Sequence, residues 1–165
     1  MIAADVCERV WHALNGVADP EIPVVSVVEL GIVRAVDARA EEVEVVITPT
    51  YSGCPATEAI EQDIRRALAA AGFAGARVRT ALSPAWTTDW ISAEGRAKLA
   101  RFGIAPPERI DPGVAPLHFV RRASVACPQC GATDTERLAE FASTACKALY
   151  RCRSCREPFD YFKPH

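Results

Sequence analysis

Four of the seven cysteines in this 165-residue chain form two Cys-x-x-Cys pairs near its C-terminus. Cys127 and Cys130 make the first pair, Cys152 and Cys155 the second, and 21 residues separate the pairs. Cysteines three positions apart can direct both thiolates at one ion when the backbone turns tightly between them. Two such turns complete the tetrahedral four-thiolate shell that zinc prefers, and the spacer is close to the roughly 15–20 residues of the usual template. The spacing therefore predicts a zinc site.

A second kind of cysteine chemistry is indicated by Cys54, in the segment Thr48–Pro55 between a predicted strand and a predicted helix. Proline is favoured at the first helical position, so the pattern predicts that Cys54 is the N-cap residue. A helix N-terminus stabilises a thiolate, which makes Cys54 a candidate reactive thiol and ligand for iron or a cluster. The alternative is that Cys54 is only a small buried residue where the strand meets the helix.

Composition excludes several classes of protein. The formal charge is −2 and the pI is near 5.9, so no overall field favours nucleic acid or an anionic membrane. Met1–Asp5 lacks a basic region followed by an apolar run, and no run of about 18 apolar residues exists. We therefore expect a cytoplasmic protein without a membrane partner. In that compartment, seven cysteines indicate metal binding or reactive thiols rather than disulfides.

Hydrophobic periodicity predicts an α/β domain ahead of the cysteine pairs. The expected elements are a helix over 5–17 with Asp5 as N-cap, a hairpin of strands 31–37 and 42–48, a helix from about Pro55 to Ala71 ended by Gly72, a third strand over 76–82, and a helix capped by Ser92 that runs to about Phe102.

The chain divides near residue 105, where a Pro-rich stretch begins. We expect an α/β domain over 1–104, a linker over 105–124 and a four-cysteine zinc ribbon over 125–165, with strands near 135–141 and 145–152. About 40 residues make a poor hydrophobic core, so the ion should supply most of the folding energy of the ribbon.

Three segments of the first domain resemble the iron–sulfur cluster assembly family long called domain of unknown function 59. They are Asp19–Pro23, Ser26–Val33 and Thr48–Pro55, and the resemblance covers about residues 5–82. Further segments point to one branch of that family. They are Pro84–Ser92, Gly103–Pro107 and the ribbon that ends with Glu157–Lys163. The full layout is similar to the family of D subunits encoded with bacterial phenylacetyl-CoA epoxidase, a multicomponent oxygenase, over essentially the whole chain.

The resemblance implies an α+β chain, in which a two-layer α/β domain of the iron–sulfur cluster assembly type precedes a small β zinc ribbon. It implies an accessory role in phenylacetate catabolism rather than catalysis, in which the chain assists maturation of the cluster or iron centre of the oxygenase components. The implied partners are the oxygenase and reductase components and iron–sulfur assembly proteins. Cys54 matches the reactive cysteine of the family, and Asp19 and Glu21 match its acidic loop.

Several alternatives stay open at this stage. The chain could be a structural or regulatory subunit of the oxygenase, or a rubredoxin-like electron carrier with iron in the four-cysteine site. The Asp19–Glu21 loop could instead fix a turn by accepting backbone N–H groups. Cys146 is left outside the ligand set because four better-spaced cysteines fill a tetrahedral shell. Acidic residues interleave with the basic residues of the ribbon, which argues against nucleic acid, and an exposed sheet edge would allow a homodimer.

Overall fold

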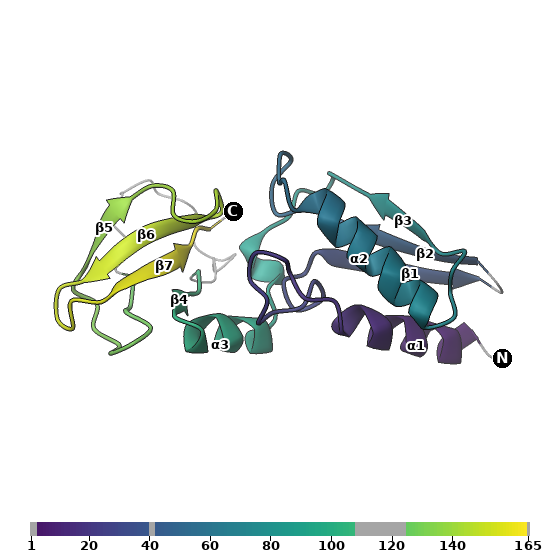
Figure 1. Cartoon of the computed structure of the whole chain (residues 1–165), viewed down its shortest axis with the longest axis horizontal. Helices are drawn as coiled ribbons and strands as arrows, with labels where there is room; N and C mark the ends of the chain where they lie inside the picture. The colour runs from purple at the N-terminus through teal and green to yellow at the C-terminus, as the bar shows by residue number, and fades with distance from the viewer. Residues whose placement is uncertain (1–2, 40–41, 108–124, 165) are drawn as a thin grey trace, which may run out of the picture. The chain divides into compact units, whose positions relative to one another are not determined.

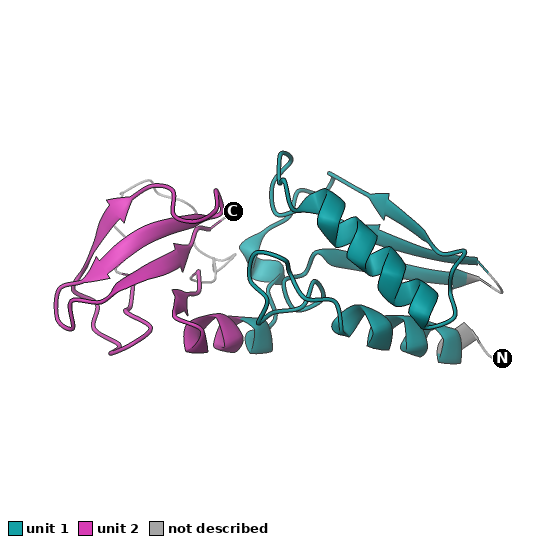
Figure 2. Cartoon of the chain, viewed as in Figure 1, with its two compact units in different colours: residues 1–95, 165 teal, residues 96–164 magenta. Residues whose placement is uncertain are grey.

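The computed structural model describes residues 3–39, 42–107 and 125–164, which form two compact units. Unit 1 extends to Gly95 and unit 2 covers Arg96–Pro164 (Figure 2). The sequence places the division near residue 105, whereas the contacts place it before Arg96, because the short strand β4 (Ile104–Ala105) pairs with the ribbon sheet. The linker expected over 105–124 lies for the most part outside the described residues.

Unit 1 is built on a three-stranded sheet in the order β1-β2-β3 (Figure 1). Strand β1 (Val33–Arg39) pairs antiparallel with β2 (Glu42–Ile47), which confirms the predicted hairpin. Strand β2 pairs parallel with β3 (Arg77–Thr80), and helix α2 (Thr57–Ala70) makes the crossover between them. Helix α1 (Ala3–Asn15) precedes the sheet and contacts both β1 and α2.

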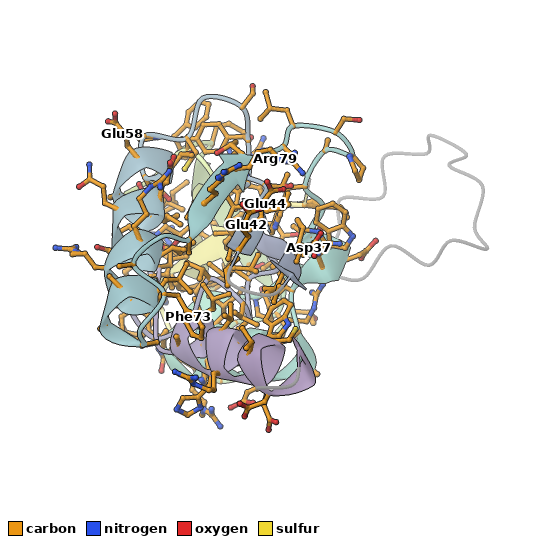
Figure 3. The ribbon with its side chains drawn as sticks, turned by 90° about the vertical axis from the view of Figure 1, so that its right-hand side faces the viewer. Asp37, Glu42, Glu44, Glu58, Phe73 and Arg79 are labelled. Atoms are coloured by element: carbon orange, nitrogen blue, oxygen red, sulfur yellow. The ribbon has the colours of Figure 1, made fainter. Side chains whose placement is uncertain are left out.

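Within the described residues, helices cover one face of this sheet, so unit 1 has two layers. Along β2 the buried and less buried residues alternate, as expected for a strand with one face against helices. The side chains that meet in the core include Val10 and Leu14 of α1, Val43, Val45 and Ile47 of β2, and Ile60, Ile64 and Leu68 of α2. The open face carries charges, including Asp37 and an ion pair of 3.2 Å between Arg79 and Glu44 (Figure 3).

Two expected helix boundaries, the end of α2 at Gly72 and the Ser92 cap of the next helix, are confirmed by their hydrogen bonds. Helix α2 ends in a Schellman motif, in which the N–H of Phe73 donates to the carbonyl of Leu68 at 2.8 Å and Gly72 has a φ of 94°. Ser92 caps α3 (Ala93–Arg101), because its Oγ accepts from the N–H of Gly95 at 2.9 Å. The prediction for Asp5 is wrong, because α1 already includes Ala3 and Asp5 lies within its first turn.

Unit 2 contains a four-stranded sheet in the order β4-β7-β6-β5. Strand β6 (Lys147–Cys152) pairs antiparallel with β5 (Thr135–Ala139) and with β7 (Pro158–Phe162), and β4 adds to β7 in parallel. The whole chain is therefore α+β, as expected. Among the described residues, no helix has both the length and the hydrophobicity that a membrane span requires.

Gly31 provides a test of the loop that precedes β1. Its φ is 70°, and a Cβ atom there would lie 2.6 Å from the carbonyl oxygen of Trp90. We expect Gly31→Ala to lower the free energy of unfolding of unit 1 by about 2–4 kcal/mol, since it adds left-handed strain to a backbone clash. Urea unfolding followed by tryptophan fluorescence measures this change.

The matched control is Gly75→Ala, since a Cβ atom at Gly75 meets nothing within 4 Å. This control should change stability by less than about 0.5 kcal/mol. Equal effects of the two substitutions would contradict the assigned role of Gly31.

Candidate metal centre

The four cysteines of the two Cys-x-x-Cys pairs come together in unit 2. Their sulfur atoms all lie within 4.8 Å of one another. Sγ of Cys127 is 3.7 Å from that of Cys155, and Sγ of Cys130 is 3.6 Å from that of Cys152. A tetrahedral zinc with bonds of about 2.3 Å holds its sulfurs about 3.8 Å apart. The donor set and its spacing therefore fit a zinc ion bound by all four thiolates.

The same backbone turn presents each pair of cysteines. In the first turn the N–H of Gly131 donates to the carbonyl of Cys127 at 2.8 Å, and Gly131 has a φ of 75°. In the second turn Arg156 occupies the equivalent position, four residues after Cys152, with a φ of 69°. The sequence analysis did not single out Arg156, although alignment of the two turns on their cysteines would have shown it opposite a glycine.

The electrostatics of the cluster favour a bound cation. The N–H of Cys155 donates to Sγ of Cys152 at 3.5 Å and, despite burial, lowers the pKa of Cys152 to about 7. A hydrogen bond from the backbone of Glu157 lowers the pKa of Cys155, but burial and the three other cysteine sulfurs together raise it to about 12. Four thiols this close cannot all ionise unless a positive charge balances them, and a divalent ion supplies that charge.

Aromatic residues form part of the ribbon core, together with Ala105 and Val125. Cys127 and Cys152 are buried in one cluster with Phe159 and Tyr161. Tyr150 packs against it, with its ring 5.4 Å from that of Tyr161 in an edge-to-face arrangement.

Cys54 is not the N-cap of α2. The helix begins at Thr57, its N-cap is Ala56, and no side chain caps it. A turn intervenes, because the N–H of Cys54 donates to the carbonyl of Tyr51 at 3.1 Å and the N–H of Thr57 donates to the carbonyl of Cys54 at 3.2 Å. The prediction that the first-turn amides point at the sulfur is therefore wrong. The side chain is half-buried on the loop that links β2 to α2, separate in sequence and in fold from the four-cysteine cluster.

Asp19 fixes a turn in the acidic loop. Its Oδ1 accepts from the backbone N–H groups of Glu21 and Ile22, both at 2.9 Å, and the residue is 7% exposed. This confirms the simpler alternative for Asp19, in which the carboxylate organises the loop. A second hydrogen-bonded turn lies nearby, which the sequence analysis did not identify. The side chain of Glu29 accepts from the N–H of Ser26, and the side chain of Ser26 accepts from the N–H of Glu29, as in a capping box.

Several basic residues in the described part of the ribbon are paired with acids. Glu136 receives hydrogen bonds from Arg151 and Arg153, and these bonds lower its pKa. The buried Lys147 pairs with Asp160 at 3.1 Å. Arg137 likewise pairs with Glu140 within the described residues of the ribbon.

Removal of the metal should unfold the ribbon and leave unit 1 folded. All three tryptophans (Trp11, Trp86 and Trp90) lie in unit 1, so tryptophan fluorescence reports on unit 1 alone. We expect a strong chelator, or Cys152→Ser, to remove the ion and the tyrosine near-UV circular dichroism of the ribbon while tryptophan emission stays unchanged.

The matched control for Cys152→Ser is Cys146→Ser, because Cys146 is buried beside the same sheet but outside the cluster. One zinc per chain should persist in this control. Equal zinc content in the two variants would contradict the assigned ligand set.

The two metal-binding turns give a further prediction. Gly131→Ala should lower the thermal stability of the metal-loaded ribbon by about 1 kcal/mol, because alanine resists a positive φ. A Cβ atom at Gly131 meets nothing within 4 Å, so a clash does not contribute. Arg156→Gly should raise stability by up to about 1 kcal/mol for the same reason. Changes of the same sign in both variants would refute the equivalence of the two turns.

Comparison with known proteins finds a matching protein family for each of the two parts of the chain. Residues 7–82 match the family model of iron–sulfur cluster assembly proteins, and residues 114–163 match the zinc β ribbon domain of PaaD. A protein of Escherichia coli K12, provisionally named the D subunit of 1,2-phenylacetyl-CoA epoxidase, is 46% identical over 98% of this chain and 95% of its own length.

Two further relatives resemble the first domain. An iron–sulfur protein maturation auxiliary factor of Porphyromonas gingivalis W83 is 35% identical over 56% of this chain and 89% of its own length. The crystal structure of a domain of unknown function 59 protein from Bacillus anthracis superimposes with a TM-score of 0.55 at 25% identity, over 59% of this chain and 93% of that protein. The chain therefore belongs to the PaaD family of proteins associated with phenylacetyl-CoA epoxidase, with an iron–sulfur cluster assembly domain followed by a four-cysteine zinc ribbon.

Proposed function

We propose that this chain is an accessory protein of a phenylacetyl-CoA epoxidase system, where it assists maturation of the iron–sulfur cluster or iron centre of the oxygenase components. The observation that carries the proposal is the near full-length similarity to the Escherichia coli epoxidase protein, joined to an N-terminal domain of the iron–sulfur cluster assembly family. The chain itself is not the catalyst in this proposal. Its cargo is iron or a cluster, and its partners are the oxygenase and reductase components.

Cys54 is the proposed working thiol. It is the one cysteine in the loop that follows β2 and is half-buried, so an iron ion or cluster brought by another protein could reach it. One cysteine supplies one ligand, and a cluster held there must take its other ligands from a donor, a client or a small thiol. Such incomplete coordination favours transient transfer over permanent storage.

The zinc ribbon has the opposite chemistry in this proposal. Four thiolates fill a tetrahedral shell, so the ion has no open position for a substrate or a client ligand. The ribbon is therefore assigned a structural role, in which the metal holds a docking domain in its folded form. Iron in this site would make the chain a rubredoxin-like carrier, a role that a colourless, redox-silent purified protein would exclude.

A second candidate is a structural or regulatory component that binds the oxygenase stably and handles no iron. The Escherichia coli relative is named as part of the epoxidase itself, which favours this candidate. It requires a stoichiometric complex that persists on size exclusion at micromolar concentration, whereas a maturation factor need only bind transiently.

The test is to produce the oxygenase and reductase components with and without this chain, and then to assay their iron, acid-labile sulfide and epoxidase activity. We expect a loss of iron or sulfide in its absence. We expect Cys54→Ala to reproduce that loss with an unchanged melting temperature, because the cargo loses its ligand while the fold is intact.

Cys7→Ala is the control, since Cys7 is also half-buried in unit 1 but lies on α1 outside the Cys54 loop. Fully loaded components that stay inactive until the chain is added back would replace the maturation role with the structural one. Full function of the Cys54→Ala variant would remove Cys54 from the proposal.

A further inference from the structure

Two segments of unit 1 leave its sheet at the same end. Strands β2 and β3 are parallel neighbours, so the segments that follow them start at the same edge of the sheet (Figure 1). The N–H of Ala81 donates to the carbonyl of Ile47 at 2.8 Å at the point where both strands end. The segment after β2 carries Cys54, and the segment after β3 carries Leu82.

Leu82 is an exposed apolar side chain on an anchored segment. It is 59% exposed, and among the described residues of unit 1 no other large hydrophobic side chain is exposed. The hydrogen bond of Ala81 holds the start of its segment. Trp86 holds the other end, because it is buried and its Nε1 donates to the carbonyl of Leu30 at 3.0 Å. The fold therefore presents Leu82 to solvent at a defined place.

The two segments carry no charge. Residues 48–57 and 80–88 contain no charged side chain, although charged residues make up 24% of the chain. Charge resumes at Glu58 and Asp89, which are both exposed and border the two segments. An uncharged centre with an exposed apolar side chain and a charged border has the composition of a protein–protein interface.

The chemistry assigned to Cys54 determines what must cover this surface. One cysteine supplies one ligand, so a second protein must bring its own ligands within bonding distance of the same cluster. That protein then contacts the residues around Cys54, and Leu82 is the exposed apolar side chain at this end of the sheet. Cysteine ligands are typical of iron–sulfur clusters, so the second protein is the epoxidase component that contains acid-labile sulfide.

We propose that the Cys54 segment and the Leu82 segment form one docking surface for the cluster-bearing component of the epoxidase in its cluster-free form. The inference rests on the proposed function, because the cargo at Cys54 identifies the occupant. Leu82 is a positioning residue in this inference. It binds no metal, and its burial against an apolar patch of the client brings the vacant cysteines of the client to Cys54.

The test measures binding of the full zinc-loaded chain to the cluster-free form of the component that contains acid-labile sulfide. We expect Leu82→Asp to raise the Kd at least about tenfold in biolayer interferometry, because it buries an unpaired charge in an apolar interface. The melting temperature should not change, since the side chain is exposed. Leu82→Met should bind as wild type does, because methionine keeps the apolar volume.

A second readout places the client over Cys54. The component should slow alkylation of Cys54 by iodoacetamide in wild type but not in Leu82→Asp, as measured by mass spectrometry of the peptide that contains Cys54. The control is Ala74→Asp, because Ala74 is exposed in the turn before β3, at the opposite end of that strand. This control adds the same charge away from the surface, so its Kd should equal that of wild type.

The outcomes separate the inference from the proposed function. An unchanged Kd for Leu82→Asp, or alkylation of Cys54 that the bound component does not slow, would overturn the docking surface even where Cys54→Ala abolishes loading. Wild type that binds only the sulfide-free component, or neither component, would overturn the choice of client. Normal loading by Cys54→Ala would instead remove the proposed role of that thiol, while a Kd that depends on Leu82 would keep the docking surface.

Discussion

The proximity of four thiol groups is the constraint on which unit 2 depends. Sulfurs within 4.8 Å of one another can all be thiolates only around a cation, and the opposed pKa shifts of Cys152 and Cys155 express this conflict. The core around them is small, with Phe159, Tyr161 and a few further side chains. Because so little apolar area is available, the ion joins the turn ahead of β5 to the turn between β6 and β7, and we expect it to determine whether the ribbon folds.

Unit 1 is stabilised in a different way. Two amphipathic helices cover one face of its sheet, and its largest fully buried side chains are aliphatic. Side-chain hydrogen bonds hold its loops in place. They include the Asp19 turn, the Ser26–Glu29 capping box and the hydrogen bond that Trp86 Nε1 donates to the carbonyl of Leu30 at 3.0 Å. We therefore expect loss of metal to act on one unit only, because the two units are stabilised by different interactions.

Features that are local in sequence could be predicted, and features that depend on distant or finely balanced contacts could not. The cysteine spacing, the Schellman glycine Gly72 and the Ser92 cap are each set within a few residues. The two-residue strand β4 has no pattern of its own and forms because β7 offers an edge. Cys54 failed as an N-cap because Pro55 is compatible with a first helical position and also with a turn. The backbone adopts the turn, which delays the helix to Thr57.

The contrast between the two kinds of cysteine site limits where cargo can be handled. A filled four-thiolate shell exchanges its ion only by breaking bonds that also hold the ribbon together, so transfer from that site would be coupled to unfolding. A single cysteine ligand at Cys54 has the opposite limits, since it contributes one bond and can release its cargo without structural cost. In the proposed function, iron or a cluster passes to an oxygenase component at Cys54, and the client supplies the ligands that Cys54 cannot.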